Sequence, residues 1–68
     1  MTYDIVYRDV KHSSGWQALV KTPLIPKIGE LINLGSKAGT VVSIEHNHKT
    51  DRDSRVVFDY LNIYLDLI

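Results

Sequence analysis

Residues 40–46, TVVSIEH, carry the clearest strand pattern in the chain. Val42, Ile44 and His46 fall on one side of an extended backbone and the residues between them fall on the other, because side chains alternate along a strand. Valine and isoleucine are β-branched, which favours this conformation. We therefore predict a strand here and expect it to be central in a sheet.

The residues before this strand predict a turn, a short strand and a crossing segment. Residues 35–39, GSKAG, have the composition of a tight turn, and residues 30–34 alternate as a short strand after a turn at Gly29. Pro23 and Pro26 each lack a backbone donor and bias the preceding residue toward extended conformations. Residues 22–27 should therefore cross between strands without joining a ladder.

The N-terminal third predicts a β-hairpin. Residues 3–10 alternate with a period of two, and residues 16–21 resume an extended pattern after a polar, glycine-containing segment at 11–15. We expect these two strands to pair with each other.

The C-terminal third is ambiguous in period. Residues 47–54 contain no apolar side chain and predict a solvated hairpin loop. Residues 55–68 fit both a helical stripe and an alternating strand, so periodicity alone does not decide. We predict a strand because β-branched and aromatic residues dominate and no helix cap precedes them. A C-terminal helical turn stays open.

The predicted fold class is all-β, one domain spanning residues 1–68. Five strands joined by short turns suggest a small, strongly bent sheet or an SH3-like or OB-like barrel, since closure removes exposed edges. A chain of 68 residues without cysteine has no disulfide to staple it, so we also expect a homo-oligomer.

The amino-acid composition narrows the range of possible functions. Eight basic residues balance eight acidic ones, which weakens a DNA-coating role. The absence of cysteine excludes a thiol enzyme, and the chain has neither a signal-peptide pattern nor an apolar run long enough to cross a bilayer. We expect a cytoplasmic protein with no membrane partner.

Residues 25–32, IPKIGELI, followed by the strand at 41–46 and the alternating tail, resemble small barrel proteins of phages and mobile elements. The resemblance covers the pattern of residues 23–65 and rests on the Pro-x-x-Gly-Glu turn that leads into the strand. It implies an accessory protein that occupies a surface or captures a ligand, as phage inhibitors of host defence do.

Aromatic and basic side chains supply the predicted binding residues. Phe58, Tyr60 and Tyr64 fall on one face of the tail, opposite a leucine-rich face, and such a patch predicts an oligomer contact or a partner site. Trp16 is read as a core or interface anchor. The full set predicted to bind a ligand or partner is Trp16, Lys37, His46, His48, Lys49, Arg52, Arg55, Phe58, Tyr60 and Tyr64.

Catalytic and metal motifs are weak. No serine lies in a Gly-x-Ser-x-Gly context, and the 35–39 turn lacks the spacing of a phosphate-binding loop. His46 and His48, with His12, Asp51 and Asp53 as conceivable further ligands, lack the tight four-ligand spacing of a structural zinc site. We predict no catalytic residue, no metal and no cofactor.

These observations favour a non-enzymatic binding protein that sequesters a host protein or an anionic small molecule. A nucleic-acid-binding barrel is the second hypothesis, and it requires Lys37, Lys49, Arg52 and Arg55 to converge on the face that carries the tyrosines. The third is a structural subunit of a virion-like assembly.

Overall fold

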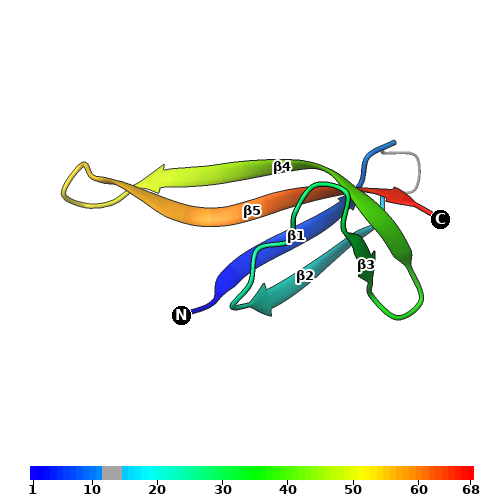
Figure 1. The fold of residues 1–68 in the computed structure, drawn as a ribbon. Coiled ribbons are helices and arrows are strands. Elements are labelled where there is room, and N and C mark those ends of the chain that lie inside the picture. The colour runs from blue at the N-terminus through cyan, green and yellow to red at the C-terminus, as the bar shows by residue number, and fades with distance from the viewer. Residues whose placement is uncertain (12–14) are drawn as a thin grey trace.

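The computed structural model describes residues 1–11 and 15–68. His12, Ser13 and Ser14, in the predicted 11–15 turn, lie outside the described residues. The chain forms five strands, which are labelled in Figure 1. They are β1 (Tyr3–Asp9), β2 (Gln17–Thr22), β3 (Leu31–Asn33), β4 (Ala38–Thr50) and β5 (Val56–Leu67).

The all-β prediction is confirmed, and the ambiguous tail is a strand as far as Leu67. No C-terminal helical turn forms there. None of the described residues belongs to a helix that could cross a membrane.

The strands form one mixed sheet in the order β2-β1-β5-β4-β3. The predicted N-terminal hairpin is confirmed, since β1 and β2 pair antiparallel. β1 also pairs in parallel with β5, which brings the first and last strands of the chain side by side.

The expectation that residues 40–46 form the central strand is wrong: the central strand is β5, and β4 lies next to the edge strand β3. β5 buries Leu61, Asn62 and Ile63 in succession, so it is covered on both faces. The polar Asn62 interrupts the apolar run in the sequence and conceals this burial.

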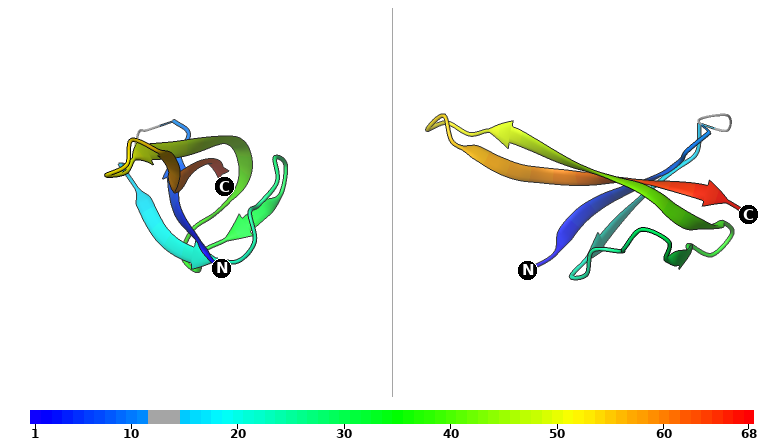
Figure 2. Two further views of the ribbon diagram at one scale, coloured as in Figure 1. Left: turned by 90° about the vertical axis from the view of Figure 1, so that its left-hand side faces the viewer. Right: turned by 45° about the horizontal axis from the view of Figure 1, so that its top comes forward.

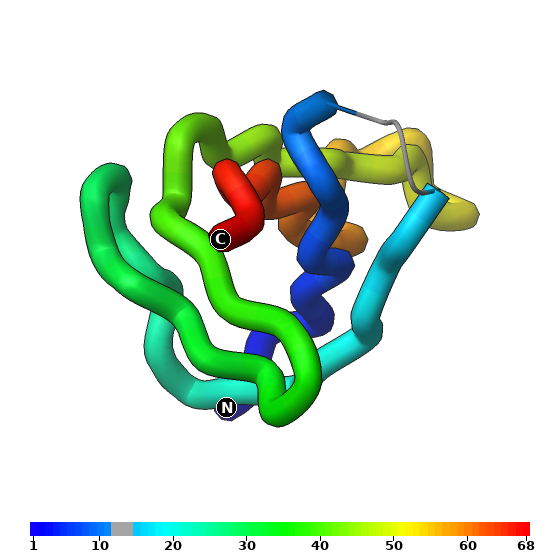
Figure 3. Tube along the Cα trace, turned by 90° about the vertical axis from the view of Figure 1, so that its right-hand side faces the viewer, coloured from blue at the N-terminus to red at the C-terminus, as the bar shows by residue number. Residues whose placement is uncertain are grey.

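The sheet curls strongly into a half-barrel, with β2 and β3 at its two edges and residues 23–30 crossing between them (Figures 2 and 3). Two register shifts in the β4–β5 ladder, between Val41 and Ser43 and between Asn47 and His48, mark bulges. Bulges bend a strand and increase its twist, which helps the sheet to curl. The buried apolar residues, which form the core, are Ile5, Tyr7, Val41, Leu61, Ile63 and Leu65.

The far end of the β4–β5 hairpin extends beyond the half-barrel, on the left in Figure 1. β1 pairs with β5 only from Leu61 onward, so no third strand pairs with residues 46–60, which we call the arm. The predicted solvated loop at 47–54 is therefore wrong in extent, because β4 continues to Thr50 and the loop is confined to residues 51–55. A ribbon solvated on both faces accepts polar side chains, so the lack of apolar residues did not end the strand.

The arm makes the molecule extended. Its radius of gyration is 13.0 Å, against about 11 Å for a compact domain of this length. Its accessible surface is 4872 Å², about 500 Å² more than surface scaling gives for a compact monomer of this mass. The arm thus exposes surface that a compact fold would bury.

Candidate functional site

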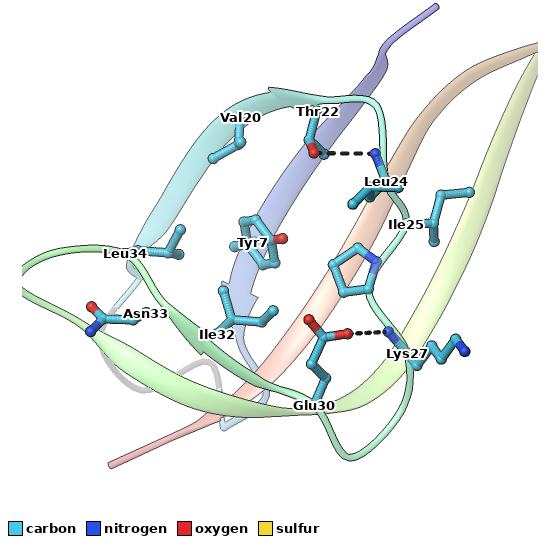
Figure 4. Close-up of a pocket in the computed structure, with 11 residues that line it drawn as sticks. Tyr7, Val20, Thr22, Leu24, Ile25, Lys27, Glu30, Ile32, Asn33 and Leu34 are labelled. Carbon is cyan, nitrogen blue, oxygen red and sulfur yellow. Dashed lines mark hydrogen bonds between the residues drawn. The ribbon is translucent and has the colours of Figure 1, made fainter.

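A pocket of about 490 Å³ opens on the concave face of the half-barrel, between the edge strands and the crossing segment (Figure 4). We call this pocket the mouth. Its lining comes from β1, β2, β3 and the residues that connect β2 to β3. The lining residues are Tyr7, Val20, Thr22, Leu24, Ile25, Pro26, Lys27, Glu30, Ile32, Asn33 and Leu34.

Tyr7 places a polar group inside this mainly apolar mouth. Alternation along β1 puts Tyr7 on the concave face with Ile5, and only 4% of the residue is exposed. Its hydroxyl points into the mouth (Figure 4), where no residue of 1–11 or 15–68 forms a hydrogen bond with it. Among the described residues no buried side-chain polar atom lacks a hydrogen-bond partner, so the Tyr7 oxygen is open to solvent through the mouth and can donate or accept a hydrogen bond there.

The environment keeps the Tyr7 phenol neutral. Burial raises the pKa of Tyr7 above its ordinary value of 10.0, and the negative charge of Glu30 raises it further. A phenol with a raised pKa acts at neutral pH as a hydrogen-bonding group and not as a base.

Glu30 supplies the negative charge at the mouth. Gly29 adopts a positive φ of 88°, which a glycine accepts without strain, and its N–H donates to the Val41 carbonyl at 2.8 Å. This turn directs Glu30 toward the pocket, where Oε1 accepts the backbone N–H of Lys27 at 3.1 Å. The Lys27 side chain extends away from Tyr7 in Figure 4, so it does not cover the carboxylate.

Two further polar side chains of the mouth accept hydrogen bonds from backbone N–H groups. Thr22 Oγ1 accepts the N–H of Leu24 at 3.3 Å, and Asn33 Oδ1 accepts the N–H of Gly35 at 3.0 Å. Leu24 and Ile25 remain 75% and 37% exposed at the rim. The mouth can therefore receive an apolar group that carries a hydrogen-bond donor or a positive charge.

A second hollow, of about 550 Å³, lies on the convex face. Its charged groups already have partners within the chain: Lys21 Nζ lies 3.7 Å from Asp4 Oδ1, and Arg8 Nε donates to Asn62 Oδ1 at 3.0 Å. The two hollows are similar in volume, but of the two only the mouth is lined by a carboxylate, that of Glu30, that forms no ion pair with a described residue. We take the mouth as the candidate site.

Asn62 links three strands on this convex face. Besides accepting from Arg8, its amide donates to Glu45 Oε1 at 2.9 Å, and Asn47 donates to the same oxygen at 3.2 Å. These two hydrogen bonds, with a smaller contribution from the charge of Arg8, lower the pKa of Glu45. The network joins β1, β5 and β4, and none of its residues lines the mouth.

The prediction that Phe58, Tyr60 and Tyr64 share one face is wrong. The register shift at Asp59 places Phe58 opposite His48, and its ring meets those of Tyr3 and His48 edge to face at 5.9 and 6.1 Å. Tyr3 belongs to the concave face, whereas Tyr60 lines the convex hollow. A bulge reverses the alternation on which the sequence prediction relied.

The other predicted residues also lie in separate places. Trp16 is half-buried and packs against the core, which agrees with its prediction as a core or interface anchor. Tyr64 is half-buried on β5, paired with Ser43. The arm carries the predicted residues that come from the end of β4, the 51–55 turn and the start of β5. These are His46, His48, Lys49, Arg52, Arg55, Phe58 and Tyr60.

The four predicted basic residues do not converge. Lys37 lies in the turn between β3 and β4, whereas Lys49, Arg52 and Arg55 lie at the other end of the 13-residue β4 and beyond it. A strand of that length spans about 40 Å. The condition set for nucleic-acid binding is therefore not met by these residues.

Within residues 1–11 and 15–68, no three His, Asp or Glu side chains come together as a metal site. His12, considered as a further ligand, lies outside the described residues. The prediction of no metal stays a prediction.

Sequence reasoning missed Tyr7 and Glu30, which place a hydroxyl and a carboxylate at the mouth. Tyr7 was placed correctly on a strand, but nothing local showed that its hydroxyl would face a hollow and not packed side chains. A usable signal was a tyrosine between Ile5 and Asp9 on one strand face, because a buried phenol needs a partner.

The fold and the mouth together define a small half-barrel with an accessible concave pocket. Comparison with protein-family models, with curated proteins and with solved structures gives no match. The resemblance of residues 23–65 to small phage barrels therefore stays a prediction.

Proposed function

We propose that this chain is a non-enzymatic binding protein whose mouth receives an apolar side chain and a neighbouring basic group of a polypeptide partner. The observation that carries the proposal is the hydroxyl of Tyr7, a residue that is only 4% exposed. This hydroxyl points into the mouth and has no hydrogen-bond partner among the described residues.

The chemistry of the mouth favours a cationic or donor-bearing partner. Its walls are aliphatic, its rim exposes Leu24 and Ile25, and Glu30 contributes a carboxylate. An exposed apolar rim around a pocket is typical of a protein-binding surface. An anionic small molecule fits this pocket less well, because Glu30 would repel it.

The proposal is tested by selecting a random dodecapeptide library against the immobilised protein. Enriched peptides should carry a large aliphatic or aromatic residue beside Lys or Arg. Their affinity should fall at least about threefold in Glu30→Gln, because a complementary charge is lost.

Asp4→Asn is the matched control, since it removes one carboxylate from the convex face and should leave affinity unchanged. Enrichment of acidic peptides, or equal binding by wild type and Glu30→Gln, would contradict the proposal.

A further inference from the structure

The arm is the second feature of this chain that lacks a partner. Residues 46–60 form a two-stranded ribbon, and such a ribbon is marginally stable in water on its own. Near its tip, Val56 is 74% exposed. Among the described residues none forms an ion pair with Arg52 or Arg55, whereas Lys49 lies 3.9 Å from Asp59.

The tip of the arm is well ordered by its own hydrogen bonds. Asp51 Oδ1 accepts the backbone N–H groups of Asp53 and Arg55, both at 2.9 Å, and the Asp51 N–H donates to the Arg55 carbonyl at 2.9 Å. The Asp51 carboxylate is engaged with the backbone, so the exposed turn presents the side chains of Arg52 and Arg55 together with one outward carboxylate, that of Asp53. The arm thus presents an apolar residue beside basic groups on a formed scaffold.

This is the chemistry that the proposed function assigns to the partner of the mouth. The arm extends away from β3 and from the crossing segment (Figures 1 and 2), so it does not reach the mouth of its own chain. Resting on the proposed function, we infer that the partner is a second copy of this chain, whose arm enters the mouth with Val56 against Leu24 and Ile25 and an arginine facing Glu30.

The exposed area is of the right order for such a contact. The excess surface of about 500 Å² per chain is a large part of the roughly 800 Å² per partner that a standard interface buries. The contact joins two different surfaces, so two copies can engage reciprocally, or further copies can add head to tail.

Sedimentation velocity on charge-reversed chains tests the inference. Wild type should assemble with rising concentration up to about 500 µM, a range that covers weak association. Glu30→Arg places basic groups at both mouth and arm, and the double variant Arg52→Glu, Arg55→Glu places acidic groups at both. Each should associate at least about tenfold more weakly than wild type, because like charges then face each other.

An equal mixture of the two variants should recover assembly, because every mouth then finds an arm of opposite charge. Lys21→Glu, a charge reversal on the convex face, is the control and should assemble like wild type. Isotope-filtered NOE spectra of mixed labelled and unlabelled wild type should show contacts from Val56 to Leu24, which keeps the test decisive if a variant misfolds.

A wild-type chain that stays monomeric, or an assembly that Glu30→Arg leaves intact, would overturn the inference that the arm of a second copy enters the mouth. Peptide binding through the mouth is measured separately with added peptides and would survive that result. Loss of both peptide binding and assembly would overturn the proposed function as well.

Discussion

Asn62 and Glu45 are joined across the β4–β5 ladder by a side-chain hydrogen bond of 2.9 Å on the convex face. Asn62 lies on the central strand, is 6% exposed, and also accepts from Arg8 on β1. One amide thus connects the parallel and the antiparallel halves of the sheet.

Asn62→Ala should lower the free energy of unfolding by about 1–3 kcal/mol, because it leaves Arg8 and Glu45 without their buried partner. Urea unfolding followed by circular dichroism measures the change. Asn47→Ala removes only the exposed 3.2 Å bond to Glu45 and should cost less than about 0.5 kcal/mol. Equal losses in the two variants would show that Asn62 does not hold the strands together.

Glu45 should make stability depend on acid pH. Its hydrogen bonds lower its pKa in the folded state below the ordinary 4.5, so the folded state binds the proton less tightly than the unfolded one. The resulting stabilisation is complete above the ordinary pKa and is lost as the pH falls through the folded value. Urea midpoints measured between about pH 6 and pH 2 should fall less steeply for Glu45→Gln than for wild type. If the urea midpoints of the two proteins fall equally with pH, Glu45 does not contribute to the pH dependence of stability.

Gly39 should not accept a side chain. A Cβ built there would lie 2.7 Å from the Asp66 carbonyl oxygen and 3.1 Å from the Leu65 Cβ, both on the central strand. Gly39→Ala should therefore destabilise the fold by about 1–3 kcal/mol, read from thermal or urea unfolding. Ser36→Ala, in the exposed turn before β4, should change stability by no more than about 0.5 kcal/mol. A stable Gly39→Ala variant would mean that β4 and β5 are less closely packed.

Phe58 should anchor the base of the arm to the half-barrel through its edge-to-face contact with Tyr3. In Phe58→Ala, amide hydrogens of residues 46–60 should exchange faster while those of Leu61, Ile63 and Leu65 keep their protection, because the arm opens locally. Val57→Ala, on the same strand, is the control. Uniform loss of protection across β5 would indicate that the arm and the body unfold together.

Much of the fold follows from local pattern. Alternation predicted β1, β2 and β3, and the β-branched and aromatic residues of the tail predicted β5. Pro23 and Pro26 predicted the crossing segment that carries part of the mouth. The sequence predictions were wrong where strand pairing determines the structure. β4 continues to Thr50 because β5 pairs with its polar end, and the polar Asn62 interrupts the apolar run that would have identified β5 as the central strand.

The candidate site was less accessible to sequence reasoning. Curvature of the sheet brings Tyr7 and Glu30 to the same pocket. No local sequence pattern predicts how closely two strand edges approach each other. The bulge at Asp59 likewise moved Phe58 away from Tyr60 and Tyr64, since one extra residue reverses every later side chain.

The most direct test of the mouth as a recognition site is the affinity of a library-selected peptide for Tyr7→Phe, measured by titration calorimetry. The substitution removes one hydroxyl and keeps the ring in the core. Affinity should fall about two- to tenfold, the value of one hydrogen bond, while Tyr60→Phe on the convex face binds like wild type. Unchanged affinity in Tyr7→Phe, or an equal loss in Tyr60→Phe, would contradict the claim that the mouth recognises the partner.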